Sequence, residues 1–102
     1  MPVTSHVSGD GKAVTIRVAG QFTFSVYPEF REATRQPALK PDASFVIDLT
    51  GAEYMDSSAL GMLLVLRERA GGDRANIAIT HCSPEIRKIL SIANFDRLFR
   101  ID

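Results

Sequence analysis

A strand, a helix and a second strand occupy the middle of the sequence, and this unit constrains the fold more than any other feature. The apolar runs "SFVIDL" at 44–49 and "NIAIT" at 76–80 have the length of strands, and such runs are typical of strands covered on both faces of a sheet. Between them lies an apolar helix pattern of about fifteen residues, which ends at Gly71 and Gly72, a strong C-terminal stop. This order predicts parallel strands joined by a right-handed crossover helix.

The residues before this unit predict a β-hairpin and a first helix. Runs rich in β-branched residues at 3–7 and 13–18 flank a Gly-Asp-Gly turn, and this pattern is typical of two antiparallel strands. Ser25 can cap a helix over 26–36, and Pro37 then ends that helix.

A third helix and a short closing strand complete the predicted order. Ser83 can cap a helix that has Pro84 at its first position and Glu85 in its first turn, and "LFRI" near the end favours an edge strand. The sequence shows no internal repeat and no long linker. It predicts a single α/β domain over 1–102, a mixed β-sheet with an N-terminal hairpin, βαβ units and helices packed against it.

The charge balance and the apolar runs exclude several classes of protein. Lys and Arg together number 12, as do Asp and Glu, so the formal net charge is zero and no basic surplus favours nucleic acid. The N-terminal residues lack the apolar region of a secretory signal. The longest apolar run, 59–66, is far shorter than the ~20 residues of a membrane span. We therefore expect a cytoplasmic protein without membrane insertion, whose single cysteine, Cys82, is a partly buried structural residue.

The sequence gives little support to the hypothesis that this protein is an enzyme. Serine chemistry needs an activating base, but the only histidines are His6 and His81, for which we expect structural or surface roles. No Gly-x-Ser-x-Gly elbow, P-loop or metal-ligand spacing is present, so no catalytic residue, metal or cofactor is expected. A receiver domain would use Asp48 at a strand end together with a nearby acidic pair, which "VTIRVAGQF" lacks. Asp48 is therefore predicted to fix the following loop by accepting hydrogen bonds.

The stretch "YMDSSALGMLL" at 54–64 carries the strongest functional signal. Asp56 or Ser57 is a credible N-cap for the long helix, because a side-chain oxygen there can accept a free backbone N–H. Ser58 then falls in the first turn, with its hydroxyl near solvent. Helix capping alone explains the presence of Asp56 and Ser57, but it does not explain Ser58.

The helix that follows is apolar nearly all round in its first turns. At ~100° per residue, the side that we expect to face the core carries Ala59, Leu60, Leu63, Leu66 and Ala70. The opposite side carries Gly61, Met62, Val65, Glu68 and Arg69. A surface helix of a lone domain rarely exposes so many apolar residues. Either another part of the chain covers them, or Gly61, Met62 and Val65 form a surface on which a partner docks.

These features together suggest a switch. Phosphorylation of Ser58 would add about −1.5 to −2 charges, which the free amides and the dipole of a helix N-terminus tolerate. A partner packed on the adjacent apolar residues would have to desolvate that charge beside Asp56, at a high cost in affinity.

The motif and its preceding strand resemble the signature of the STAS domain, the bacterial anti-sigma factor antagonist family. "FVIDLTGAEYMDSSALGMLL" carries the family pattern at Asp48, Leu49, Asp56, Ser57, Ser58, Leu60 and Gly61. Ala59 stands where the family often has glycine, and its small size should have little consequence. "GQFTFSVYPEFREA" resembles the family's segment from the second strand into the first helix, and the predicted element order fits the STAS fold over nearly the whole chain.

The resemblance implies an anti-sigma factor antagonist that works by partner switching. The unphosphorylated domain would bind an anti-sigma factor that is also a serine protein kinase, and would free a sigma factor. The kinase would phosphorylate the second serine of the motif, here Ser58, beside Asp56 and Ser57, which shape the site, and a PP2C-like phosphatase would reverse the mark. An alternative is a constitutive STAS subunit of a transporter or stress-signalling scaffold, without a phospho-switch. Whether the domain forms a homodimer stays open.

Overall fold

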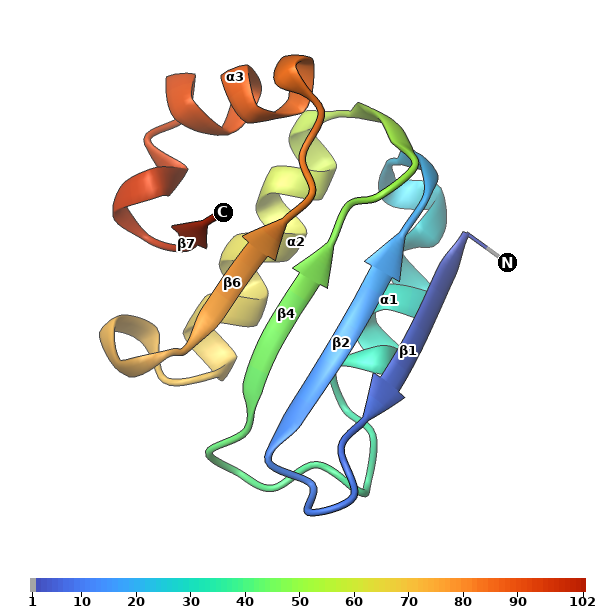
Figure 1. Ribbon diagram of the computed structural model, residues 1–102, viewed down its shortest axis with the longest axis vertical. Coiled ribbons are helices and arrows are strands. Elements are labelled where there is room, and N and C mark those ends of the chain that lie inside the picture. Colours follow the sequence, from blue (N-terminus) through green and yellow to red (C-terminus); the bar gives the residue numbers. More distant parts are fainter. Residues whose placement is uncertain (1) are drawn as a thin grey trace.

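The computed structural model describes residues 2–102, which form a five-stranded mixed sheet in the order β1-β2-β4-β6-β7 (Figure 1). The strands are β1 (Val3–Val7), β2 (Ala13–Val18), β4 (Ser44–Asp48), β6 (Ile77–Thr80) and β7 (Arg100–Ile101). The β1–β2 pair is antiparallel, and β2, β4, β6 and β7 are parallel neighbours. The predictions of a mixed sheet, an N-terminal hairpin and a strand–helix–strand unit are confirmed.

Three α-helices accompany this sheet: α1 (Tyr27–Ala33), α2 (Ser57–Arg69) and α3 (Pro84–Ile92). Short 3-10 helices precede α1 and follow α2 and α3, at η1 (Phe24–Val26), η2 (Gly72–Arg74) and η3 (Phe95–Arg97). The α1 and α2 helices lie behind the sheet in Figure 1, whereas α3 follows the carboxyl end of β6. Across residues 2–102, no helix combines the length and the apolar character that crossing a bilayer requires.

Only one face of the sheet is covered by α1 and α2. The prediction that the strand at 44–49 is covered on both faces is wrong, because Val46 on the other face is only half-buried and its neighbours Thr15 and Arg17 are exposed. The steps from β2 to β4 and from β4 to β6 run in the same direction across the sheet. Right-handed crossovers in one direction place both helices on the same face.

The core lies between this face of the sheet and the helices. Ile16 and Ile47 of the central strands and Leu63 of α2 are fully buried. The alternation of buried and exposed residues along β2 follows from the two-residue period of a strand.

A second, two-stranded parallel sheet joins β3 (Gly20–Phe22) to β5 (Ala52–Met55). Both segments are short, and neither has the sustained alternation of apolar residues that would indicate a strand in the sequence. Phe22 and Met55 are register partners and are both buried. This small sheet brings together the chain segments that lead into α1 and α2, so it places the starts of the two helices side by side.

The element ends differ from the predictions by a few residues. The first helix ends at Ala33 instead of residue 36, and Thr23, not Ser25, supplies the side-chain cap in that region, accepting from the N–H of Ser25. Ser83 caps α3 as predicted, because its Oγ accepts from the N–H of Ile86 at 3.2 Å. The closing strand is confirmed but holds only two residues.

Candidate functional site

Asp56 begins the α2 helix. Its backbone is extended, and its Oδ1 accepts a hydrogen bond from the N–H of Ala59 at 3.0 Å. Of the two candidate caps, the structure therefore selects Asp56, and Ser57 and Ser58 become the first two helical residues. The N–H of Asp56 donates to the carbonyl of Phe22 at 3.4 Å, which ties the cap to the end of β3.

Removal of this cap should destabilise the domain modestly. Asp56→Ala is expected to lower the free energy of unfolding by about 1 kcal/mol, because the amide of Ala59 loses its side-chain acceptor. Urea unfolding followed by circular dichroism measures this change. Ser57→Ala is the matched control, since this exposed residue caps nothing, and it should change stability by less than about 0.5 kcal/mol. Equal losses in the two variants would contradict the assignment of the cap.

The two serines of the motif differ in exposure. Ser57 is exposed, and Ser58 is half-buried. Within residues 2–102, Ser58 Oγ has no hydrogen-bond partner, and it is absent from the buried polar atoms that lack one. The Ser58 hydroxyl therefore reaches solvent, as the sequence predicts. The first turn of α2 holds no acidic residue, so the cap Asp56 is the acidic group that precedes the two serines in the chain.

An exposed apolar strip follows the serines along α2. Gly61 and Val65 succeed Ser57 at intervals of four residues, so all three lie on one side of the helix. Val65 is 51% exposed and its neighbour Leu64 is 39% exposed. A Cβ built on Gly61 would meet no atom within 4 Å, so nothing covers the helix backbone there. We call Gly61, Leu64 and Val65 the α2 strip.

Met62 does not belong to this strip. Its exposed fraction is only 5%, and it lines a narrow crevice between α1 and α2 together with Tyr27 and Phe30. The expectation that Met62 lies on the exposed side with Gly61 and Val65 is therefore wrong, because α1 covers this side of α2. For Met62, the alternative that another part of the chain covers the helix is correct.

A protein-family model described as "Mlab, STAS domain" matches residues 5–100, which is most of the chain. The chain belongs to the STAS-domain family. A relative named STAS-domain containing protein, from Pseudomonas aeruginosa (strain UCBPP-PA14), is 50% identical over 101 residues, covering 99% of each chain. The family resemblance drawn from the Asp-Ser-Ser motif is thus confirmed.

Solved structures share the fold of this STAS domain. An anti-sigma factor antagonist from Mycobacterium paratuberculosis matches with a TM-score of 0.74 at 20% identity, covering 97% of this chain and 84% of that one. The Bacillus cell fate determinant SpoIIAA in the phosphorylated form matches with a TM-score of 0.67 at 16% identity, covering 98% and 90%. At such identities the likeness shows a common fold, and it confirms the predicted single STAS-type α/β arrangement.

Asp48 of the STAS domain fixes the loop that leads from β4 to β5. Its Oδ1 accepts from the backbone N–H of Thr50 at 2.9 Å and from the Thr50 hydroxyl at 2.6 Å. Arg17 Nη2 lies 3.2 Å from Oδ2, and His81 Nδ1 lies 3.3 Å from Oδ1. Burial alone would raise the pKa of Asp48, but the hydrogen bonds from Thr50 and then Arg17 outweigh it and hold this pKa below its usual value. The predicted role of Asp48 as a loop-fixing acceptor is confirmed.

Asp48→Asn should destabilise the STAS domain in a pH-dependent way. We expect a loss of about 1–3 kcal/mol near pH 7, because charge-assisted hydrogen bonds are removed. The folded pKa lies below the unfolded value of about 3.9, so the stabilisation is complete above that value and is lost as the pH falls through the folded pKa. Urea unfolding of both proteins between about pH 7 and pH 3 should show a shrinking difference. A constant difference, or an equal effect of Asp42→Asn at an exposed position, would contradict this account.

Phe24 is a surface residue near the motif that sequence reasoning missed. Its side chain is 64% exposed and stacks on Tyr27, with ring centroids 5.4 Å apart and an interplanar angle of 8°. It follows Phe22 by two residues, within about 7 Å of extended chain, and the Phe22 carbonyl bonds to Asp56 at the start of α2. The sequence signal that could have indicated this exposed residue is an aromatic side chain in the short connection between a strand and a helix.

The remaining reactive groups offer little chemistry. Cys82 is half-buried, and burial raises the pKa of its thiol despite the opposing charge of Arg87. A thiol with a raised pKa is a poor nucleophile near neutral pH. Within the part of the chain that the structure describes, no group of three or more His, Cys, Asp and Glu residues could hold a metal ion.

Proposed function

We propose that this STAS domain is an anti-sigma factor antagonist that works by partner switching. Its unphosphorylated form binds an anti-sigma factor that is also a serine protein kinase, and thereby frees a sigma factor. Phosphorylation of Ser58 abolishes this binding, and a PP2C-like phosphatase restores it. The observation that carries the proposal is the solvent-reaching Ser58 hydroxyl, which precedes the exposed α2 strip on the same helix.

The position of Ser58 explains why the domain survives the modification. A phosphate at the start of α2 meets the positive end of the helix dipole, which favours an anion by about 0.3–1 kcal/mol. The phosphorylated domain should therefore keep its fold. A solved structure of the same fold, SpoIIAA, is in the phosphorylated form, which supports this expectation.

The same phosphate opposes a partner that packs on the α2 strip. Gly61 allows close approach to the helix backbone, and Val65 offers apolar area. The partner would have to desolvate a phosphate of about −2 charges next to Asp56. Asp56 and Ser57 shape the site, since Asp56 holds the helix start and Ser57 precedes the acceptor serine. We propose no catalytic role for these residues, and place the binding in the cytoplasm, where a kinase has ATP.

The proposal is tested by locating phosphate and by measuring capture of the partner. The protein is incubated with ATP and a lysate of its source cells, and mass spectrometry locates any added phosphate. We expect phosphate on Ser58, not on the more exposed Ser57. In parallel, wild type and Ser58→Ala should capture the same partner, which Ser58→Asp should fail to capture. Phosphate absent from Ser58 under all conditions, with capture unaffected by Ser58→Asp, would instead support a constitutive STAS subunit.

A further inference from the structure

Four basic side chains gather in a groove between α1 and α2. Arg31 and Arg35 line a hollow of about 550 Å³ along α1, and Arg35, Lys40 and Arg69 line an adjoining hollow of about 420 Å³. We call these four residues the basic groove. Arg31, Arg35 and Lys40 lie within ten residues of one another, and the packing of α1 against the end of α2 brings Arg69 to them.

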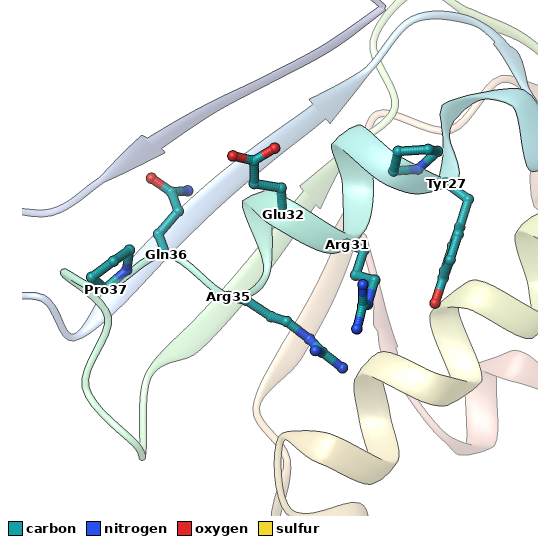
Figure 2. A pocket seen from close by; sticks show the side chains of 7 residues that line it. Tyr27, Arg31, Glu32, Arg35, Gln36 and Pro37 are labelled. Atoms are coloured by element: carbon teal, nitrogen blue, oxygen red, sulfur yellow. The ribbon is translucent and has the colours of Figure 1, made fainter.

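Two arginine side chains of the basic groove, Arg31 and Arg35, point toward the same space. Figure 2 shows Arg31 of α1 and Arg35, two residues after the end of α1, extending toward α2, on the same side as the hydroxyl end of Tyr27. The acidic side chain of Glu32 points away, toward the strands. Glu32 also lines the hollow that Arg31 and Arg35 line, but within residues 2–102 it makes no ion pair within 4.0 Å with either guanidinium group.

In the part of the chain that the structure describes, the arginines of the basic groove lack acidic partners, whereas the hydrogen bonds from Ser8 and Lys12, and then the charge of Lys40, lower the pKa of Asp10. Among residues 2–102, the ion pairs within 4.0 Å involve Arg17, Arg67, His81 and Arg100, and none involves a residue of the basic groove. Arg69 Nη1 instead donates to Thr34 Oγ1 at 3.5 Å. Partial burial and then the charges of Arg35 and Arg31 lower the pKa of Arg69. In a chain of zero net charge, such unneutralised repulsion has a cost in stability, which a bound anion would offset.

The basic groove is continuous with the apolar surface that begins at the motif. The narrow crevice that holds Arg31, Arg35 and Arg69 is also lined by Tyr27 and by Val65 of the α2 strip. Guanidinium groups bind carboxylates through paired hydrogen bonds. Open hollows that place guanidinium groups beside apolar side chains fit a peptide segment better than a small enclosed ligand.

We infer that the basic groove binds an acidic segment of the protein partner, with carboxylates at Arg31, Arg35 and Arg69 and an apolar side chain on Val65. This inference rests on the proposed function. Arg69 lies eleven positions after Ser58 on α2, or about 16 Å along the helix, which exceeds the Debye length of about 8 Å at physiological ionic strength. The Arg69 end of the groove thus attracts and orients the partner beyond the reach of the Ser58 phosphate.

A peptide titration tests the basic groove without the partner. Hexaglutamate is added to the full ¹⁵N-labelled chain at low ionic strength, and amide chemical shifts are followed. We expect saturable shifts at residues around Arg31, Arg35 and Arg69, and at least about tenfold weaker binding to Arg35→Glu/Arg69→Glu. Arg35→Gln/Arg69→Gln serves if the reversed variant does not fold. Lys88→Glu/Arg97→Glu, with the same charge change at exposed positions on α3 and η3, should bind as wild type.

Three outcomes would overturn the inference. Shifts absent from these residues, equal binding by wild type and the Arg35/Arg69 variants, or saturation by inorganic phosphate as readily as by hexaglutamate would each do so, the last by indicating a site for small anions. The titration involves neither kinase nor modified serine, so its failure leaves the Ser58 switch standing. Conversely, a groove that binds hexaglutamate while Ser58→Asp still captures the partner would refute the switch alone.

Discussion

Ser58→Asp is expected to weaken binding of the captured partner by about a hundredfold or more, which corresponds to about 2.7 kcal/mol. The added carboxylate lies at the start of α2 beside Asp56, and a partner packed on the α2 strip would have to desolvate it. Isothermal titration calorimetry with the purified partner measures the change in affinity.

Two controls separate this effect from a loss of structure. Ser91→Asp introduces the same charge at an exposed position on α3 and should bind the partner as wild type does. Urea unfolding of Ser58→Asp should give a free energy of unfolding within about 1 kcal/mol of the wild type, because the helix N-terminus favours an anion. Unchanged affinity in Ser58→Asp, or equal losses in the two variants, would contradict the switch.

Met62→Ala should lower stability and leave partner binding nearly unchanged, whereas Val65→Ala should weaken partner binding and leave stability nearly unchanged. Met62 is 5% exposed, so its truncation leaves a cavity between α1 and α2 and should cost about 2–4 kcal/mol of unfolding free energy. Val65 is 51% exposed, so its truncation should change stability by less than about 0.5 kcal/mol. Urea unfolding of the two variants measures both values.

The affinity for the partner should also differ between the two variants, with the larger loss in Val65→Ala. At a temperature at which both variants are folded, Val65→Ala should bind the captured partner more weakly than the wild type, whereas Met62→Ala should bind it nearly as tightly as the wild type. A small stability loss for Met62→Ala would contradict the covering of Met62 by α1. Unchanged affinity for Val65→Ala would remove Val65 from the proposed docking surface.

Features that depend on neighbouring residues in the chain were predictable. A cap at Asp56 or Ser57 was predictable, because a short polar side chain there reaches a nearby backbone amide, and the structure assigns the cap to Asp56. The same holds for Ser83 at the start of α3 and for the loop fixed by Asp48, which bonds to Thr50 only two residues away. The hairpin likewise depends on a local turn.

Features that depend on a distant neighbour were mispredicted or missed. The segments of β3 and β5 are strands only because they pair with each other, and alone they are too short to show a strand pattern. Val46 was expected to be covered, but a short apolar strand does not reveal how many of its faces carry a helix. The sequence does not reveal the basic groove, because Arg31 and Arg69 are 38 positions apart and only the packing of α1 against α2 brings them together.

The sequence by itself determined the element order, the family signature and the position of Ser58 at the start of a helix, because periodicity, turns and caps act over a few residues. Only the tertiary structure decided which sides of that helix stay accessible. The α1 helix covers Met62, leaves Val65 exposed and brings Arg31 and Arg35 to Arg69. The physical reason is that burial and charge clustering depend on which elements pack together, and right-handed crossovers placed α1 and α2 side by side on one face of the sheet.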